Sequence, residues 1–339
     1  MKTTSKKILG GVLAIVVIGA GAYLFDRYFL KNSVNTIIEK PAVDDLNSKS
    51  SNVPKPDIKT TTDKIVYLAD KDNVRQVVID DANGDAAKVL FTDKDEDLKI
   101  KAATDIAYLS REVLLFMGGD TSGKFFIVKL DGSQDKSVID NTSKPSSFAI
   151  SPDGQKIAYV IFSNVEASYG YNIIVMNRKG ENRRVLFNTP EIINYLSFNE
   201  DGSELAFTKT DNSGKSAISK LSLDSPQEKV IYQGSSNIPT LSWSKTGEIV
   251  FSLADSKFTS STLFEMDGGG GSLLKILDTK NGVASWPHLS SDLLSVGYLT
   301  ASYQDKFTTD VTGDVKTSGP KGQNIIKIGS GIQILGFLP

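Results

Sequence analysis

A pattern that recurs about every 45 residues constrains the fold of this chain more strongly than any other feature of its sequence. The copies are SPDGQKIAYV from Ser151, NEDGSELAFT from Asn199 and SKTGEIVFS from Ser244, with weaker counterparts from Ser110 and Ser290. A period of this size is typical of β-propellers and other repeat arrays, in which each unit forms one small sheet. The repeat therefore predicts architecture before it predicts chemistry.

Each repeat unit is predicted to contain four short strands. In the clearest unit these are SSFAI, KIAYVIF, NIIVMN and RRVLF, which are apolar or alternate in polarity. Residues Ser151 to Gly154 fit a type I turn followed by a glycine that can adopt a left-handed conformation. We therefore interpret SPDG as a hairpin corner. The corners at Ser110 and Ser290 lack the glycine, so we expect another turn type there.

The segments FAISPDGQKIAYV and LSFNEDGSELAFT resemble the repeat of the TolB-type β-propellers, a WD-repeat-like family. The resemblance extends from about residue 63 to the end of the sequence. It implies an all-β fold and a role in protein complexes of the cell envelope. The extra N-terminal domain of TolB has no counterpart in this sequence, so the partners of TolB are not carried over.

Counting the units predicts six blades that begin near residues 63, 101, 146, 192, 238 and 283. The first unit has no innermost strand, whereas IQILGFLP, from Ile332 to Pro339, is an apolar strand without a unit of its own. We expect this segment to join the first blade, because closing the ring removes sheet edges that favour aggregation. The sequence therefore predicts a six-bladed β-propeller over residues 63–339, closed by the C-terminal strand.

The N-terminal segment, residues 1–31, predicts export and a membrane anchor. Three lysines precede an uncharged run from Ile8 to Phe25, which as a helix would be about 27 Å long, close to the ~30 Å hydrocarbon core of a bilayer. Positive charge on this side predicts a cytoplasmic N-terminus and an extracytoplasmic propeller. The alternative is a signal peptide cleaved after Ala22, in the small-residue sequence Ala20-Gly21-Ala22. Both interpretations export the rest of the chain.

The segment 32–62 is rich in Ser, Asn, Lys, Asp and Pro, and we predict that it is a flexible linker. Together these segments predict a single-pass protein of the cell membrane, with the propeller in the periplasm or at the cell surface. The net charge of −2 argues against nucleic-acid binding, which requires clustered excess Lys and Arg. The absence of cysteine excludes disulfides, thiolate metal sites and a cysteine nucleophile.

No catalytic, cofactor-binding or metal site is predicted. His288 is the only histidine and no G-x-S-x-G motif is present, so we interpret His288 as a packed residue of the sixth blade's innermost strand. The acidic run Asp93–Asp97 is interpreted as a solvated loop, with a calcium site as the alternative. The alternative function is a propeller-type hydrolase acting on glycans or peptides. Its candidate carboxylates are Asp105, Glu191 and Asp292, near the predicted ends of inner strands.

Aromatic residues predict where a partner binds. In a four-stranded meander, the loops between the second and third strands emerge on the same face as the connections between blades. Large rings on a variable face are typical interface anchors, and in these loops they are Tyr169, Tyr171, Phe258, Tyr303 and Phe307. We therefore predict a non-catalytic binding or scaffolding module whose partner is an envelope protein or peptide. The alternative is that several of these rings fold back onto the blades.

Overall fold

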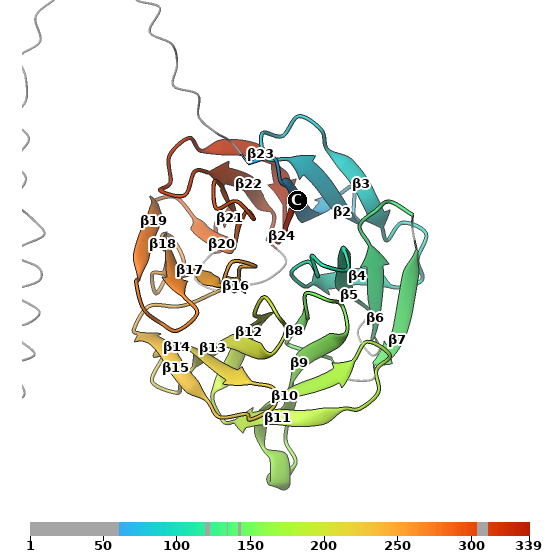
Figure 1. Ribbon diagram of the computed structural model, residues 1–339, viewed down its shortest axis with the longest axis vertical. Coiled ribbons are helices and arrows are strands. Elements are labelled where there is room, and N and C mark those ends of the chain that lie inside the picture. Colours follow the sequence, from blue (N-terminus) through green and yellow to red (C-terminus); the bar gives the residue numbers. More distant parts are fainter. Residues whose placement is uncertain (1–60, 119–122, 134, 142–143, 304–310) are drawn as a thin grey trace, which may run out of the picture. The chain divides into compact units, whose positions relative to one another are not determined.

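The computed structural model describes residues 61–118, 123–133, 135–141, 144–303 and 311–339. These residues form six four-stranded antiparallel sheets around a central axis (Figure 1). The fold is therefore the all-β, six-bladed propeller that the repeat predicts. No helix among the described residues is long and apolar enough to cross a membrane. The predicted span Ile8–Phe25 and nearly all of the predicted linker lie outside the described residues.

Each blade is a meander whose first strand lies nearest the axis. Blade 1 contains β24 (Gln333–Leu338), β1 (Lys64–Lys71), β2 (Val74–Asp81) and β3 (Lys88–Thr92), and blade 2 contains β4 (Lys99–Ala103), β5 (Glu112–Gly118), β6 (Gly123–Lys129) and β7 (Lys136–Asn141). Blade 3 contains β8 (Ser147–Ile150), β9 (Lys156–Ser163), β10 (Gly170–Asn177) and β11 (Arg184–Thr189). Blade 4 contains β12 (Ile192–Phe198), β13 (Glu204–Thr210), β14 (Ser216–Ser222) and β15 (Lys229–Gly234). Blade 5 contains β16 (Leu241–Trp243), β17 (Glu248–Ala254), β18 (Ser261–Asp267) and β19 (Leu274–Thr279). Blade 6 contains β20 (Val283–Leu289), β21 (Val296–Ala301), β22 (Gly313–Ser318) and β23 (Ile326–Gly331).

The ring is closed by β24, which pairs antiparallel with β1 and places Leu338 opposite Lys64. Every residue of β24 is buried, so the strand is the innermost layer of blade 1. Gly336 lies beside the bulge in this pairing with a φ of 135°, and a Cβ there would approach Ile106 Cγ1 to 3.0 Å. Glycine is therefore required where the closing strand packs against blade 2.

The predicted hairpin corners are present, and their glycines have positive φ angles: Gly154 (71°), Gly202 (69°) and Gly247 (98°). Leu293 occupies the same place in blade 6 with a φ of 58°, and its N–H donates to Ser290 O at 3.1 Å. Arg111 in blade 2 is also left-handed, with a φ of 53°. The expectation of another turn type at Ser290 is therefore wrong. The corner keeps its backbone conformation, and a side chain there costs about 1 to 2 kcal/mol.

The hydrophobic core lies between neighbouring blades. One cluster joins Val160 of blade 3 to Leu205 and Phe207 of blade 4, and another joins Val66 of blade 1 to Leu115 of blade 2. Inner and middle strands are therefore covered on both faces, which explains their continuous apolar sequences. This packing fixes the angle between blades and so positions the ends of the inner strands.

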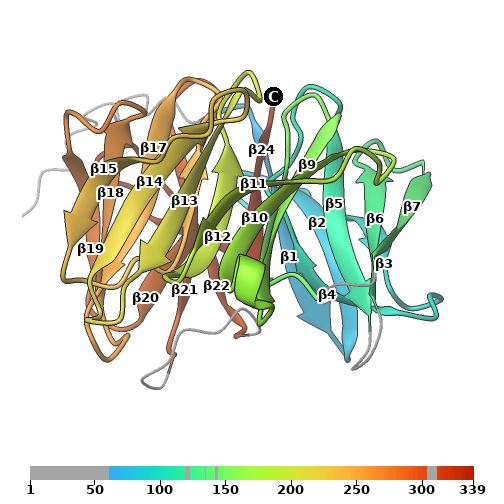
Figure 2. The ribbon, with the colours of Figure 1, turned by 90° about the horizontal axis from the view of Figure 1, so that it is seen from below.

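The two faces of the disc differ in what they carry. The corners between first and second strands lie on one face, here called the corner face, where β24 ends and β1 begins. The Asp63 carboxylate accepts hydrogen bonds from Ser291 N and Oγ, both at 2.6 Å, which fastens the first described residues to a corner of blade 6. The opposite side, the loop face, carries the blade connections and the loop with the 3-10 helix η1 (Glu166–Ser168). Figure 2 shows the C-terminus and η1 on opposite sides.

Candidate functional site

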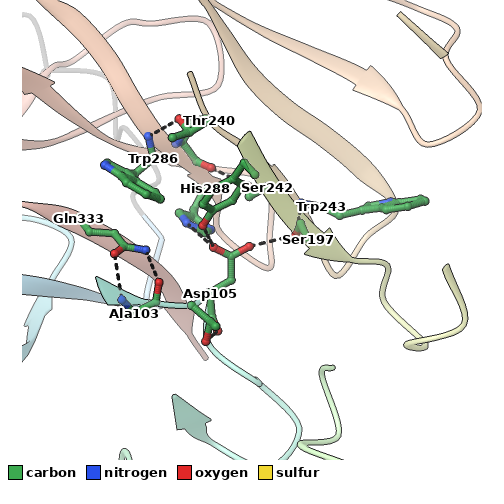
Figure 3. Close-up of polar contacts among 12 residues, drawn as sticks. Ala103, Asp105, Ser197, Thr240, Ser242, Trp243, Trp286, His288 and Gln333 are labelled. Atoms are coloured by element: carbon green, nitrogen blue, oxygen red, sulfur yellow. Dashed lines mark hydrogen bonds and ion pairs between the residues drawn. The ribbon is translucent and has the colours of Figure 1, made fainter. Parts of the chain in front are cut away.

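A polar cluster lies at the ends of the inner strands, and Figure 3 shows Asp105, Ser197 and His288 close together. We call Asp105, Tyr195, Ser197 and His288 the channel cluster. Asp105 follows β4 in blade 2, Tyr195 and Ser197 belong to β12 in blade 4, and His288 belongs to β20 in blade 6. Three blades therefore contribute to one buried group of polar side chains.

Asp105 is the centre of this cluster. The Tyr195 hydroxyl donates to Oδ1 at 3.0 Å, and the Ser197 hydroxyl donates to Oδ2 at 3.0 Å. His288 Nε2 lies 3.4 Å from Oδ1. Ser197 Oγ also accepts a hydrogen bond from the Trp243 N–H at 3.0 Å, which adds blade 5 to the network. Both carboxylate oxygens thus have protein partners, as a buried carboxylate requires.

A bulge in β20 brings His288 toward the axis. The pairing of β20 with β21 shifts register between Ser285 and His288, and Trp286 has a left-handed φ of 53°. The Trp286 N–H donates to Thr240 Oγ1 at 2.8 Å, so the irregular backbone is held by blade 5 (Figure 3). Bulges commonly re-aim a side chain in this way.

Burial dominates the ionisation of the cluster. It raises the pKa of Asp105, although His288 and the hydroxyls of Ser197 and Tyr195 oppose this. Burial lowers the pKa of His288, against the attraction of Asp105 and a hydrogen bond with the backbone of Ile334. Burial and the neighbouring Asp105 also raise the pKa of Tyr195 well above its usual value. The site therefore disfavours charge on each of these groups.

The cavity beside the channel cluster is small. Its volume is about 50 Å³, and its lining includes Asp105, Tyr108, Lys245, His288 and Gly336. Little free space therefore lies directly beside Asp105.

The three candidate carboxylates of the hydrolase alternative have separate surroundings. Glu191 precedes β12 and forms an ion pair with Lys209. Glu191 lies six residues before Ser197, which donates a hydrogen bond to Asp105. At about 3.3 Å per residue of strand, Glu191 is roughly 20 Å from Ser197. Asp292 accepts hydrogen bonds within its own corner, from Ser290 Oγ at 2.6 Å and the Leu294 N–H at 3.0 Å. Glycoside hydrolysis requires a carboxylate pair about 5 to 9.5 Å apart, so Glu191 and Asp105 do not form one.

The acidic run at residue 93 is partly built into the fold. The Asp93 carboxylate is buried and accepts hydrogen bonds from the N–H groups of Arg75 and Ile100, at 3.0 and 3.1 Å. It therefore ties the start of blade 2 to blade 1. In the part of the chain that the structure describes, no three carboxylate or imidazole groups gather as metal ligands would.

The loop face carries an aromatic cluster on blade 3, formed by Phe162, Tyr169 and Tyr171. The Phe162 ring contacts those of Tyr169 and Tyr171 edge to face, with centroids 5.6 and 5.2 Å apart. Phe162 and Tyr169 are 53% and 59% exposed, and Val165 beside them is also exposed. Sequence reasoning selected Tyr169 and Tyr171 but missed Phe162. The signal for Phe162 was its position at the end of a strand, directly opposite Tyr171 in the hairpin.

The other aromatic residues selected from sequence do not join this cluster. Phe258, in blade 5, is half-buried and packs against the core. Tyr303, in blade 6, is only 3% exposed, and its hydroxyl lies 2.8 Å from Ser285 Oγ. Phe307 lies outside the described residues. The rings of Phe258 and Tyr303 thus fold back onto the blades, as the alternative interpretation of these loops expected.

Comparison with known proteins identifies the type of fold. No protein-family model and no curated protein matches the sequence. The structure is similar to a putative TolB from Agrobacterium tumefaciens, with a TM-score of 0.58 and 15% identity over 82% of this chain and 94% of that one. It is also similar to TolB from Acinetobacter baumannii, with a TM-score of 0.61 and 15% identity over 82% of this chain and 67% of that one.

A third similar structure is a chain of a nidogen/laminin complex, with a TM-score of 0.57 and 11% identity over 81% of this chain and 97% of that one. At such identities the likeness concerns the fold alone. The chain therefore has the TolB-type six-bladed propeller fold.

Proposed function

We propose that this protein is a membrane-tethered extracytoplasmic propeller that binds an envelope protein or peptide, without catalysis, through its aromatic cluster. The N-terminal run Ile8–Phe25 and the polar segment 32–62 support the tether and the location. The likeness to TolB propellers supports a place among envelope proteins. The protein partners of both Asp105 oxygens and the ion pair of Glu191 with Lys209 support binding over catalysis.

The observation that carries the proposal is the exposure of Phe162 and Tyr169, whose rings meet edge to face on a hairpin that extends beyond the innermost strand of its blade. The innermost strand β8 pairs with β9 only as far as Val160, whereas β9 continues to Ser163. Phe162 therefore has no inner strand to cover it. Because the three rings hold one another in place, little side-chain entropy remains to be lost when a partner covers them.

The position of the cluster also suits a tethered protein. Residues 61–63, which continue into the tether, lie on the corner face, whereas the aromatic cluster lies on the loop face. Residues 61–63 and the aromatic cluster thus lie on opposite faces of the disc, and the C-terminus marks the corner face in Figure 2. A partner on the loop face can reach the rings without displacing residues 61–63.

Pull-down of the tagged full-length protein from solubilised membranes tests the proposal. The test variant is Phe162→Ala/Tyr169→Ala, and the matched control is Val185→Ala/Leu274→Ala, which removes two exposed apolar side chains from outer strands. We expect a specific envelope protein to be captured by the wild type and the control but lost with the test variant. Identical captured sets with both variants would contradict the proposed binding site.

Membrane attachment is tested separately. We expect the full-length protein to remain in the membrane fraction after a high-salt or alkaline wash, because an apolar helix resists both. N-terminal sequencing of the mature protein should begin at or near Met1. A mature protein that begins after Ala22 and is released by the wash would instead identify a cleaved signal peptide.

A further inference from the structure

Two adjoining cavities lie on the corner face, along the seam where blade 6 meets blade 1. The inner cavity is lined by residues 61–63 and 81–83, and the outer cavity is lined by parts of the blade 6 corner and of the β22–β23 turn. Ala82 lines both, so they form one groove, here called the seam groove. Each cavity has a volume of about 260 Å³, compared with about 50 Å³ beside Asp105. The seam groove therefore has more room than the channel cluster.

The outer cavity is built into the contact between the two blades and is mainly apolar. The Thr317 hydroxyl donates to Ala82 O at 2.7 Å, which ties blade 6 to blade 1 beneath the groove. Leu294, Pro320 and Ile326 supply apolar lining, and no charged residue is among the described residues that line this cavity. A charged group would lose its hydration there without gaining a partner. The outer cavity therefore suits an aliphatic side chain.

The chain enters the propeller at the inner end of the seam groove. Thr61 is 7% exposed, and its hydroxyl accepts a hydrogen bond from the Asp63 N–H at 3.1 Å. The Asp63 carboxylate in turn accepts hydrogen bonds from Ser291 in the corner of blade 6. These contacts fix the point from which the preceding residues continue, and that point is in the wall of the groove itself.

We propose that residues 58–60 of the same chain dock in the seam groove and that the Ile58 side chain occupies the outer cavity. These three residues lie outside the described residues, and Ile58 is the aliphatic one among them. Ile58 stands three residues before Thr61, a span of at most roughly 10 Å. A sphere of the inner cavity's volume, about 260 Å³, is about 8 Å across. The chain can therefore cross the inner cavity and place Ile58 in the outer one.

The short connection selects this occupant over a foreign one. A segment joined to the groove by a few residues has an effective concentration there on the order of mM or higher. A foreign apolar segment would have to displace it from that advantage. Docking would lay the chain across the seam between the first and last blades, so that a pull on the N-terminal segment is resisted by blade 6 as well as by β1. This inference does not depend on the aromatic cluster.

Cross-linking within the full-length chain tests the docking. The chain has no cysteine, so Ile58→Cys/Ile326→Cys introduces one thiol in the segment and one in the outer cavity. The matched control is Ile58→Cys/Lys245→Cys, with Lys245 beside the channel cluster. Burial lowers the pKa of Lys245 and Asp63 opposes this, so Lys245 also lies near the point where the chain enters. A segment that is not docked should reach both positions.

We expect a short bismaleimide to give about tenfold more intramolecular product with Ile326→Cys than with Lys245→Cys, a ratio that corresponds to about 1.4 kcal/mol. Mass spectrometry of the joined peptides measures both yields. Equal yields, including no product from either variant, would overturn the proposal. A product that joins two copies of the chain, or that joins Ile326→Cys to a different protein, would also overturn it, because another occupant would then fill the groove.

Truncation of Ile58 tests its insertion without any new thiol. Ile58→Ala should lower the melting temperature of the full-length protein by about 2 to 4 °C, the shift that a small loss of stability produces in a domain of this size. Val53→Ala is the matched control, because it truncates a β-branched side chain of the same segment to which the proposal assigns no contact. Equal melting temperatures for the two variants would overturn the insertion of Ile58.

A double-mutant cycle identifies the cavity that Ile58 fills. In the Ile326→Ala background the outer cavity has lost part of its apolar wall, so Ile58→Ala should lower the melting temperature by less than it does in the wild type. Residues that do not touch should instead give additive shifts. Additive shifts for this pair would overturn the assignment of Ile58 to the outer cavity.

Discussion

Blades 3 and 6 differ in whether the tyrosines near the loop between their second and third strands are exposed or buried. Both have tyrosines in or beside the loop between the second and third strands, yet Tyr169 of blade 3 is 59% exposed and Tyr303 of blade 6 is 3% exposed. In blade 6, β20 pairs with β21 to the last residue of that strand, Ala301. In blade 3, β8 stops pairing at Val160, three residues before β9 ends.

In these two blades, the length of the innermost strand determines whether aromatic residues on the loop face are buried or exposed. Where the inner strand covers the whole hairpin, a ring beyond it turns inward and becomes part of the core. Where the hairpin extends further, the rings have only one another to contact. The blade 5 hairpin follows the first rule, because the bridge between Asn237 and Ala254 extends its inner cover and Phe258 is half-buried.

The largest expected difference between the two loops is in folding stability. Tyr303→Ala should lower the free energy of unfolding by about 3 to 5 kcal/mol, since it empties a buried aromatic site. Tyr169→Ala, the matched change in blade 3, should alter it by less than about 0.5 kcal/mol. Urea denaturation of both variants measures this, and similar losses for the two would break the comparison.

Replacing Phe258 should lower the free energy of unfolding by an amount between those for Tyr303 and Tyr169. Its ring packs against the core but is half-buried, so Phe258→Ala should cost about 1 to 2 kcal/mol, less than a fully buried ring. The same denaturation experiment ranks it against the two tyrosines. A cost as large as that of Tyr303→Ala would show that blade 5 buries its loop as completely as blade 6 does.

The buried tyrosine should also give the protein a specific sensitivity to alkali. Burial raises the pKa of Tyr303 to about 12, although its hydrogen bond with Ser285 opposes the rise. The folded state then holds a proton that the unfolded state releases above pH 10. Stability is therefore fully present below pH 10 and is lost as the pH rises toward 12, by about 1 kcal/mol at pH 11.

Tyr303→Phe removes this contribution to the pH dependence. Its unfolding free energy should fall less steeply between pH 9.5 and pH 11 than that of the wild type, by about 1 kcal/mol over the interval. The measurement is urea denaturation at several pH values. Parallel curves for the two proteins would argue against a buried, protonated Tyr303.

The effect of removing the ring that the sequence reasoning missed should also be small. Phe162→Ala should lower stability by about 0.5 to 1 kcal/mol, the contribution of edge-to-face contacts at an exposed site. Phe162→Leu keeps an apolar side chain but removes the ring and serves as the control. A loss above about 3 kcal/mol would show that the aromatic cluster is a structural core rather than a surface.

The periodic features of this fold could be predicted from sequence because they depend on local chemistry. Turn residues such as those at Gly154 mark the corners, and the apolar segment Ile332–Pro339 could serve only as a missing inner strand. The corner at Leu293 shows a limit of this reasoning. The surrounding ladder imposes a left-handed residue there even without glycine.

The channel cluster shows a second limit. Asp105 and His288 were each notable in the sequence, but their contact depends on two blades far apart in the chain and on a bulge at Trp286 that no local signal marks. The exposure of Phe162 likewise depends on where β8 stops pairing rather than on its own neighbours in the sequence. Features that arise from the meeting of blades therefore require the structure.

The pairing of β24 with β1 has a consequence for how the protein is made. The partner of β1 is translated roughly 260 residues after it, which at about 5 to 20 residues per second means a wait of about 10 to 50 s. Throughout that interval, the inner side of β1 is an open template for other chains. Blade 1 is therefore complete only after β24 has been made, and the inner side of β1 stays unpaired until then.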